Sequence, residues 1–146
     1  MQSLGPDQYA RLRHLASAWE QERAAELAAA SQANPHLGVD ALCFQHFTPA
    51  PPDEPSVTYL AGALVTPVSL SLVLVPAESD GPAPTPGAYR PFLFPSGRYP
   101  FIAERLSEGT WLWRCELLDD LSDLASPEEA SRLAQRLMDR VMAPEA

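Results

Sequence analysis

Residues 60–76 read Leu-Ala-Gly-Ala-Leu-Val-Thr-Pro-Val-Ser-Leu-Ser-Leu-Val-Leu-Val-Pro and form the longest apolar segment of the chain. Beyond Pro67, leucines alternate with serines and valines, and this period of two predicts a β-strand rather than a helix. Proline cannot donate a hydrogen bond to a neighbouring strand, so Pro67 is expected at a break between two strands. The segment therefore predicts two strands of the core, Leu60–Thr66 and Val68–Val75.

The same segment does not fit a membrane span. A spanning helix needs about 20 consecutive apolar residues, whereas this segment is shorter and contains an internal proline and two serines. No basic residues flank it to fix an orientation across a bilayer. We therefore expect no membrane span.

The composition indicates one acidic domain over residues 1–146. This length is sufficient for a buried core. The formal net charge is −9, with 10 Lys and Arg residues against 19 Asp and Glu residues. Binding to nucleic acid is not expected, because contacts with phosphates need a basic face. The acidic surface either provides solubility or attracts a basic segment of a partner.

The cysteines and the N-terminus favour a cytoplasmic location. Two cysteines, Cys43 and Cys115, do not form a disulfide framework. The first residues lack the charged and apolar regions of a signal peptide.

Helical patterns border the apolar centre. Residues 7–32 predict an N-terminal helix that ends before Asn34-Pro35, since a residue that precedes proline is disfavoured in helical geometry. Residues 127–142 predict a C-terminal helix with Ser126 as its N-cap, proline at its first position and Glu129 completing a capping box.

The region 39–118 predicts an antiparallel β-sheet, because short apolar segments alternate with turns rich in proline and glycine. In Trp111–Leu118 the two tryptophans, Cys115 and Leu117 share one face, which fits a sheet with one face on the core. In Val39–Phe47 a regular strand would place Val39, Ala41, Cys43 and Phe47 on one face, and Leu42 and Phe44 on the other. The fold class is therefore predicted as α+β: an N-terminal helix, a central antiparallel sheet, and a C-terminal helix packed on the sheet.

Residue patterns for catalysis and metal binding are weak. His14, His36 and His46 lack the spacing of metal ligands, so we expect no metal and no cofactor. Ser96 lies in a tight turn, but Pro-Ser-Gly-Arg is not a nucleophile elbow. Cys115 shares its strand face with tryptophans, which predicts a buried and unreactive thiol. The residues therefore favour a binding protein over an enzyme.

Several short motifs occur in an order that resembles one known family. The motifs are Asn34-Pro35, Leu64-Val-Thr-Pro67, Leu72-Val-Leu-Val-Pro76, Phe94-Pro-Ser-Gly-Arg-Tyr-Pro-Phe101 and Cys115-Glu-Leu117. Together with the terminal helix they resemble the HybE (HupJ) family of assembly chaperones for NiFe-hydrogenases, over about residues 34–141. Two positions depart from that family: Val68 replaces a usual tryptophan, and Leu118-Asp119-Asp120 replaces a frequent Ser-Pro.

The resemblance implies a non-catalytic cytoplasmic chaperone that holds hydrogenase precursor subunits until metal insertion is complete. Its expected partners are the small-subunit precursor, which carries a twin-arginine export signal, and the large subunit; a homo-oligomer is possible. The positions that carry the resemblance become candidates for the client surface: Thr66, Pro67, Pro95, Ser96, Gly97, Arg98 and Tyr99. Shaping of the turns is the alternative role for these residues. Arg98 and Tyr99 are favoured for binding, because a turn needs neither side chain.

Two other functions stay open at the level of sequence. An acidic secretion-type chaperone or peptide-binding module has a similar size and charge, although it would lack the ordered Thr-Pro and Pro-Ser-Gly motifs. A small hydrolase would use Ser96 or Cys115 as its nucleophile.

Overall fold

The computed structural model describes residues 4–48, 58–77, 84–106 and 109–144. The elements follow in the order α1 (Pro6–Glu22), α2 (Ala24–Ala29), β1 (Asp40–Phe47), β2 (Tyr59–Val65), β3 (Leu70–Pro76), β4 (Tyr89–Phe94), β5 (Gly97–Arg105), β6 (Trp111–Leu118) and α3 (Pro127–Met142). The described strands form one six-stranded antiparallel sheet in the order β1-β2-β3-β6-β5-β4. The predicted α+β class is confirmed, and the break at Pro67 is the turn between β2 and β3.

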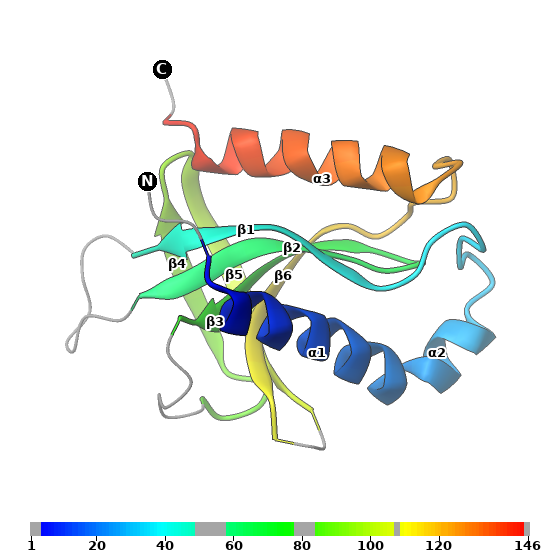
Figure 1. Ribbon diagram of the computed structural model, residues 1–146, viewed down its shortest axis with the longest axis horizontal. Helices are drawn as coiled ribbons and strands as arrows, with labels where there is room; N and C mark the ends of the chain where they lie inside the picture. The colour runs from blue at the N-terminus through cyan, green and yellow to red at the C-terminus, as the bar shows by residue number, and fades with distance from the viewer. Residues whose placement is uncertain (1–3, 49–57, 78–83, 107–108, 145–146) are drawn as a thin grey trace.

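Helices α1 and α3 cover opposite faces of the sheet (Figure 1). On the α3 side, Leu70, Leu72 and Leu74 belong to a buried cluster with Met138. On the α1 side, the alternate residues of β2 and β3 form a second buried cluster with Leu12, Leu15 and Trp19: Leu60, Leu64, Val73 and Val75. Strands β2 and β3 are therefore buried on both faces. This fits their prediction as strands of the core, whereas the expectation of one core-facing side, which was drawn from Trp111–Leu118, does not extend to them. Strands β4 and β5 do alternate between buried and more exposed residues.

The N-terminal helical region is interrupted. A single helix over residues 7–32 was expected, but α1 ends at Glu22 and the short α2 ends at Ala29. The break lies at Arg23, whose φ and ψ are −105° and 10°. There the guanidinium of Arg23 bonds Glu104 of β5. No residue of α2 is fully buried, although half-buried Leu27 packs against the cluster on the α1 side.

Strand β1 contains a bulge that changes which residues face each helix. The register shifts between Leu42 and Gln45, and Cys43 has a φ of +61°. As a result Leu42, Cys43 and Phe47 pack in the cluster on the α3 side, whereas Val39, Ala41 and Phe44 pack on the α1 side. The face assignment expected for a regular strand is therefore wrong, because an extra residue breaks the alternation.

The start of α3 is the predicted one. Ser126 Oγ accepts a hydrogen bond from the N–H of Glu129 at 3.2 Å, and Glu129 Oε1 accepts one from the N–H of Ala125 at 2.8 Å. These bonds satisfy donors at a helix start that have no partner within the helix.

Candidate partner-binding surface

The turn between β2 and β3 is held by the side chain of Thr66. Its hydroxyl accepts hydrogen bonds from the N–H groups of Val68 at 3.1 Å and Ser69 at 2.9 Å. Thr66 is fully buried, and the carbonyl of Pro67 accepts a hydrogen bond from the N–H of Asn34 at 2.8 Å. The Asn34-Pro35 and Thr66-Pro67 motifs of the sequence therefore meet in space.

The side chain of Asn34 connects this turn to the segment before α3. Its amide donates to the carbonyls of Leu121 at 2.7 Å and Leu124 at 2.8 Å, and its Oδ1 accepts from the N–H of His36. Only 3% of Asn34 is exposed. From sequence, Asn34-Pro35 was expected only to end the N-terminal helix, and the hydrogen bonds of the Asn34 side chain were not predicted.

The hairpin between β4 and β5 carries the other candidate residues. Gly97 has a φ of +146°, which favours glycine. The N–H of Ser96 donates to the carbonyl of Val141 in α3 at 3.2 Å, and the Ser96 hydroxyl lies 2.7 Å from that of Tyr99. Tyr99 is half-buried with its ring edge-on to Phe94. By contrast Arg98 is exposed and makes no hydrogen bond or ion pair with a described residue.

The two groups of candidate residues lie near opposite ends of α3. Thr66 and Pro67 adjoin Asn34, which bonds the segment just before α3, whereas Ser96 bonds its last turn. A helix of 16 residues is about 24 Å long at about 1.5 Å per residue. The structure therefore brings Pro95–Tyr99 together in one hairpin and does not bring Thr66 and Pro67 to them.

Strands β5 and β6 separate between these two groups. They pair only from Ile102 to Arg105 with Trp111 to Arg114. Beyond that ladder, and among the residues that the structure describes, Gly97–Phe101 pairs with β4 alone and Cys115–Leu118 with β3 alone. We call these two segments, Gly97–Phe101 and Cys115–Leu118, the fork.

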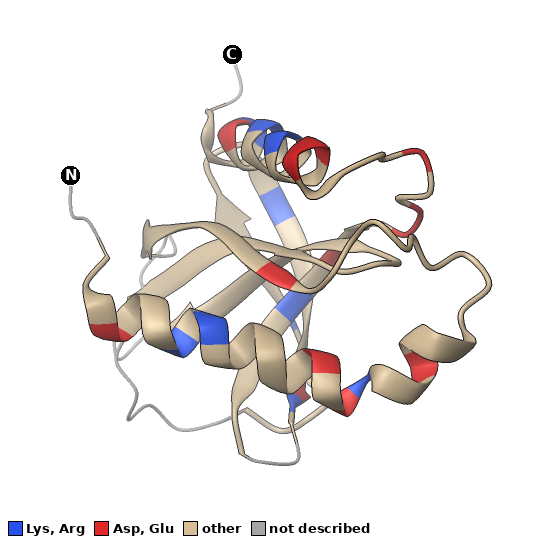
Figure 2. Ribbon diagram, turned by 45° about the vertical axis from the view of Figure 1, so that its right-hand side comes forward, with Lys and Arg blue, Asp and Glu red and all other residues tan. Residues whose placement is uncertain are grey.

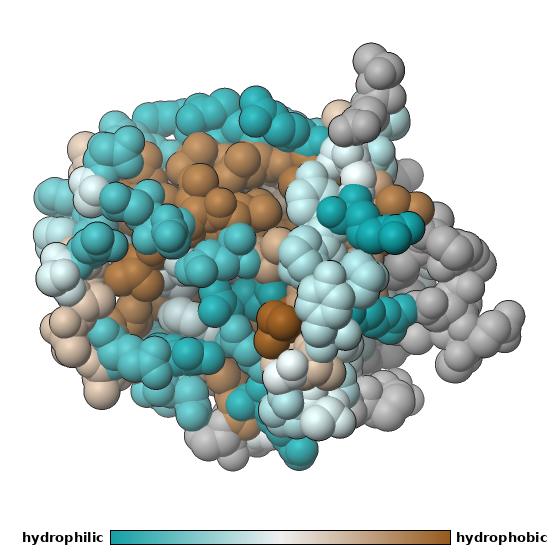
Figure 3. All heavy atoms as spheres, turned by 180° about the vertical axis from the view of Figure 1, so that it is seen from behind, coloured by the Kyte–Doolittle hydropathy of each residue, from teal (hydrophilic) through white to brown (hydrophobic). Residues whose placement is uncertain are grey.

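An apolar surface lies beside the fork and below α3 (Figure 3). Leu133 and Leu137 are half-buried on one flank of α3, and Gln135 on the other flank contacts Cys43 of β1. Because residues two apart in a helix point to different sides, this contact turns the two leucines away from β1 and toward the fork. Half-buried Leu117 of β6 lies on the same side of the sheet.

Acidic side chains follow the fork where β6 ends. Glu116, Asp119, Asp120 and Asp123 are exposed, and none forms an ion pair with a described residue. Figure 2 shows acidic positions on the segment that leads from β6 to α3. The N–H of Ser122 bonds Asp120 Oδ1 at 2.9 Å, and bonds from Ser122 lower the pKa of Asp120. This end of the fork therefore attracts positive charge.

The nucleophile candidates lack catalytic partners among the described residues. The hydroxyl of Ser96 contacts Tyr99 rather than a histidine or a carboxylate. Cys115 is buried, with 7% of its surface exposed, and burial raises the pKa of its thiol. Within the described ranges no group of three or more His, Cys, Asp or Glu side chains is placed to hold a metal ion.

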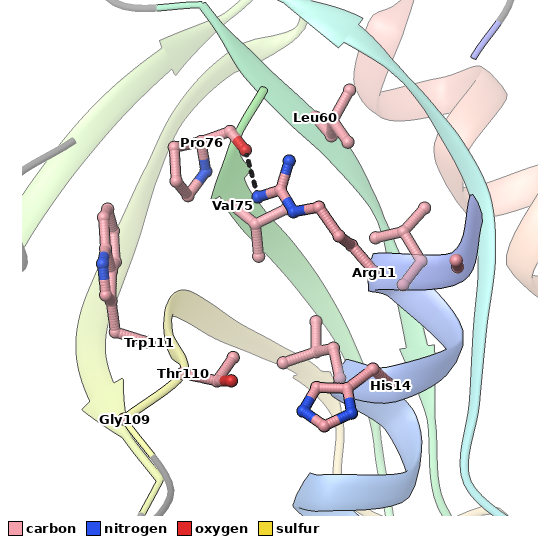
Figure 4. Close-up of a pocket in the computed structure, with 11 residues that line it drawn as sticks. Arg11, His14, Leu60, Val75, Pro76, Gly109, Thr110 and Trp111 are labelled. Carbon is pink, nitrogen blue, oxygen red and sulfur yellow. Dashed lines mark hydrogen bonds between the residues drawn. The ribbon is translucent and has the colours of Figure 1, made fainter. Parts of the chain in front are cut away.

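A cavity of about 580 Å³ lies between α1, the end of β3 and the start of β6 (Figure 4). Arg11 reaches across it and donates to the carbonyls of Pro76 at 2.8 Å and Ala77 at 2.9 Å. These bonds occupy the guanidinium within the fold, so the cavity offers mainly apolar lining. Among the helices in the described part of the chain, none has the length and apolarity needed to cross a bilayer.

Comparison with known proteins places the chain in a family. A family model described as NiFe-hydrogenase assembly, chaperone, HybE matches residues 10–146. The solution structure of HybE from Escherichia coli has a similar fold, with a TM-score of 0.62 and 20% identity, covering 90% of this chain and 76% of that one. No curated protein matches the sequence. Because the family model spans nearly the whole sequence, this chain belongs to the HybE family of NiFe-hydrogenase assembly chaperones.

Proposed function

We propose that this protein is a non-catalytic cytoplasmic chaperone that binds NiFe-hydrogenase precursor subunits during maturation. Its clients are the small subunit with its twin-arginine export signal and the large subunit, and binding delays export until the cofactors are inserted. The observation that carries this proposal is the family match over residues 10–146. The acidic end of the fork supports it, because unpaired carboxylates attract a signal that contains paired arginines.

The proposed client surface includes the β4–β5 hairpin. Arg98 is the residue in direct contact, since it is exposed and bound to no described residue. Pro95, Ser96, Gly97 and Tyr99 hold the hairpin beside α3, where the client would lie. Thr66 and Pro67 contribute at the other end of α3 by fixing the turn that carries Val68.

The test is co-purification of the tagged full-length protein with the small-subunit precursor, with and without its export signal, and with the large subunit. We expect capture of the complete small-subunit precursor and weaker capture of the truncated form. Equal capture of both forms would place the contact on the folded body of the client. Capture of neither subunit would refute the chaperone proposal.

Arg98→Ala tests the hairpin within the same assay. It should reduce capture about tenfold if Arg98 carries a charge-assisted contact, since about 1.4 kcal/mol corresponds to a factor of ten. Arg136→Ala is the matched control, because Arg136 is also exposed but lies on the outer face of α3. If the two substitutions reduce capture equally, Arg98 is not part of the client surface.

A further inference from the structure

The hydrogen bonds of β5 determine which of its backbone groups point into the fork. The N–H of Ala103 donates to the carbonyl of Ala88 at 2.9 Å, and its carbonyl accepts from the N–H of Gly87 at 2.8 Å. Backbone groups along an antiparallel strand alternate in direction. Ile102 therefore faces Arg114 of β6, its partner in the ladder, and Pro100 faces the unpaired side. Since proline lacks an N–H, this edge of β5 offers a carbonyl and no donor at Pro100.

The opposite edge of the fork, on β6, offers both a backbone donor and a backbone acceptor. Arg114 faces Ile102, so the next residue, Cys115, faces β3, where Leu72 is its partner. Glu116 then directs its N–H and carbonyl away from β3 and into the fork. The register with β3 shifts just beyond Glu116, and β6 ends at Leu118 without pairing with β5 again. An unpaired edge of this kind accepts an added strand from a bound peptide.

The side chains beside this edge specify an apolar segment. An added strand would turn every second side chain toward α3. On that side lie Leu117, Leu133, Leu137 and the ring of Tyr99, all half-buried. The free part of β6, Cys115–Leu118, has room for about four residues of a strand at about 3.3 Å each.

The charges specify the direction in which that segment runs. The acidic residues Asp119, Asp120 and Asp123 follow the end of β6. A strand that runs antiparallel to β6 therefore begins beside these carboxylates and continues toward Arg114. Basic residues must then precede the apolar residues along the bound peptide. An export signal has this order, with a positive region followed by an apolar region.

We propose that the fork binds one extended segment of the client as a strand antiparallel to β6, with arginines beside Asp119–Asp123 and apolar residues against α3. The proposal rests on the proposed function, because it takes the export signal of the small-subunit precursor as the occupant. It adds the binding mode, the order of charge and apolarity, and Glu116 as the residue whose backbone pairs with the client.

The order of the peptide is tested with two labelled synthetic peptides of equal composition. One has two arginines followed by six residues that alternate valine and threonine, and the other has the same residues in reverse order. Fluorescence anisotropy with the full-length protein should give about tenfold tighter binding of the arginine-first peptide. Equal affinities would overturn the proposal. A second copy of this chain is the alternative occupant of the fork. In that case neither peptide would bind, the protein would be a dimer, and Glu116→Pro would convert the dimer into a monomer; this result would overturn the proposal.

The backbone pairing is tested by comparing Glu116→Pro with Glu116→Gln. Both remove the carboxylate, but only proline also removes the N–H that points into the fork. Proline should weaken binding of the arginine-first peptide at least about tenfold more than glutamine does. Leu93→Pro is the control for folding, because Leu93 points its backbone away from β5 at the outer edge of β4, in the same alternation as Pro91. If the two Glu116 variants bind equally, the peptide does not add as a strand.

Amide hydrogen exchange provides an independent readout of the same contact. Exchange at Glu116 should slow when the peptide binds, while exchange at Leu93 should not change. Capture of the precursor by Glu116→Pro at the wild-type level would leave the chaperone function intact and overturn the fork as its site. Binding of the peptide at the fork without capture of any precursor would refute the function and leave the fork as a peptide site.

Discussion

Gly62 of β2 packs directly against the ring of Phe44 in β1, so that no side chain fits at this position. A Cβ atom at Gly62 would lie much closer than 3.0 Å to atoms of the Phe44 ring, an approach that real Cβ atoms essentially never show. The bulge in β1, with Cys43 at a φ of +61°, places the ring there. Glycine is therefore required at this position by its neighbour across the sheet rather than by its own backbone.

Gly62→Ala should lower the free energy of unfolding by about 1–3 kcal/mol, because the ring and the strand beneath it must move apart. Urea unfolding followed by far-UV circular dichroism measures the change. Gly38→Ala serves as the control: a Cβ at Gly38 meets no atom within 4 Å, and its effect should stay within about 0.5 kcal/mol. Similar losses for both variants would contradict the packing argument.

The roles of some residues could be predicted from the sequence, and those of others could not. Ser126 was predicted as an N-cap and Cys115 as a buried thiol, because both roles follow from neighbours in the chain. The contact between Gly62 and Phe44 was not predicted, since it depends on the register of two strands. The bonds of Thr66 to Val68 and Ser69 were not predicted either, although they are local and span only two and three residues.

At the scale of elements, Asn34 joins three connections: the segment after α2, the β2–β3 turn and the segment before α3. Asn34→Ala removes both donors to the carbonyls of Leu121 and Leu124. A buried acceptor that loses its partner costs more than the bond itself, so the free energy of unfolding should fall by about 2–3 kcal/mol in urea titration. Gln32→Ala, at an exposed position of the same connection, should change it by less than about 0.5 kcal/mol. If Asn34→Ala also lowers the free energy of unfolding by less than about 0.5 kcal/mol, the three connections do not depend on the Asn34 side chain.

Elements with strong periodicity were easier to predict than their interruptions. The strands around Pro67 and the start of α3 follow from local patterns, and the structure has both. The break at Arg23 was missed because alanine-rich sequence favours a continuous helix, while the bond from Arg23 to Glu104 comes from a strand far along the chain.

At the scale of the whole molecule, Glu104 of β5 fastens the α1 layer to the sheet. Its carboxylate bonds the indole N–H of Trp19 at 3.3 Å and Arg23 at 3.1 Å, and it also pairs with Arg114 of β6. The guanidinium of Arg114 in turn donates to Ser71 of β3 at 2.8 Å. The network therefore ties a helix to three strands on one face.

Glu104→Gln should loosen the α1 layer selectively, because it removes the charge that two arginines share. The expected loss in the free energy of unfolding is about 1.5–3 kcal/mol, as for hydrogen bonds to charged groups. Hydrogen exchange should increase in α1 more than in α3, which packs on the opposite face. Glu26→Gln removes an exposed carboxylate that also pairs with Arg23, at 3.5 Å, and should have little effect. Equal increases in both helices would contradict a network that acts on one layer.

Local patterns in the sequence were enough to predict the strands of this protein, its two long helices, the turn residues that separate them and the acidic surface. These properties depend on side-chain period, proline and capping groups, which act over a few residues. Three features appear only in the folded protein: the burial of β2 and β3 on both faces, the bulge in β1 and the separation of β5 from β6. Those features depend on the register and twist of strands distant in the chain, for which local patterns carry no information.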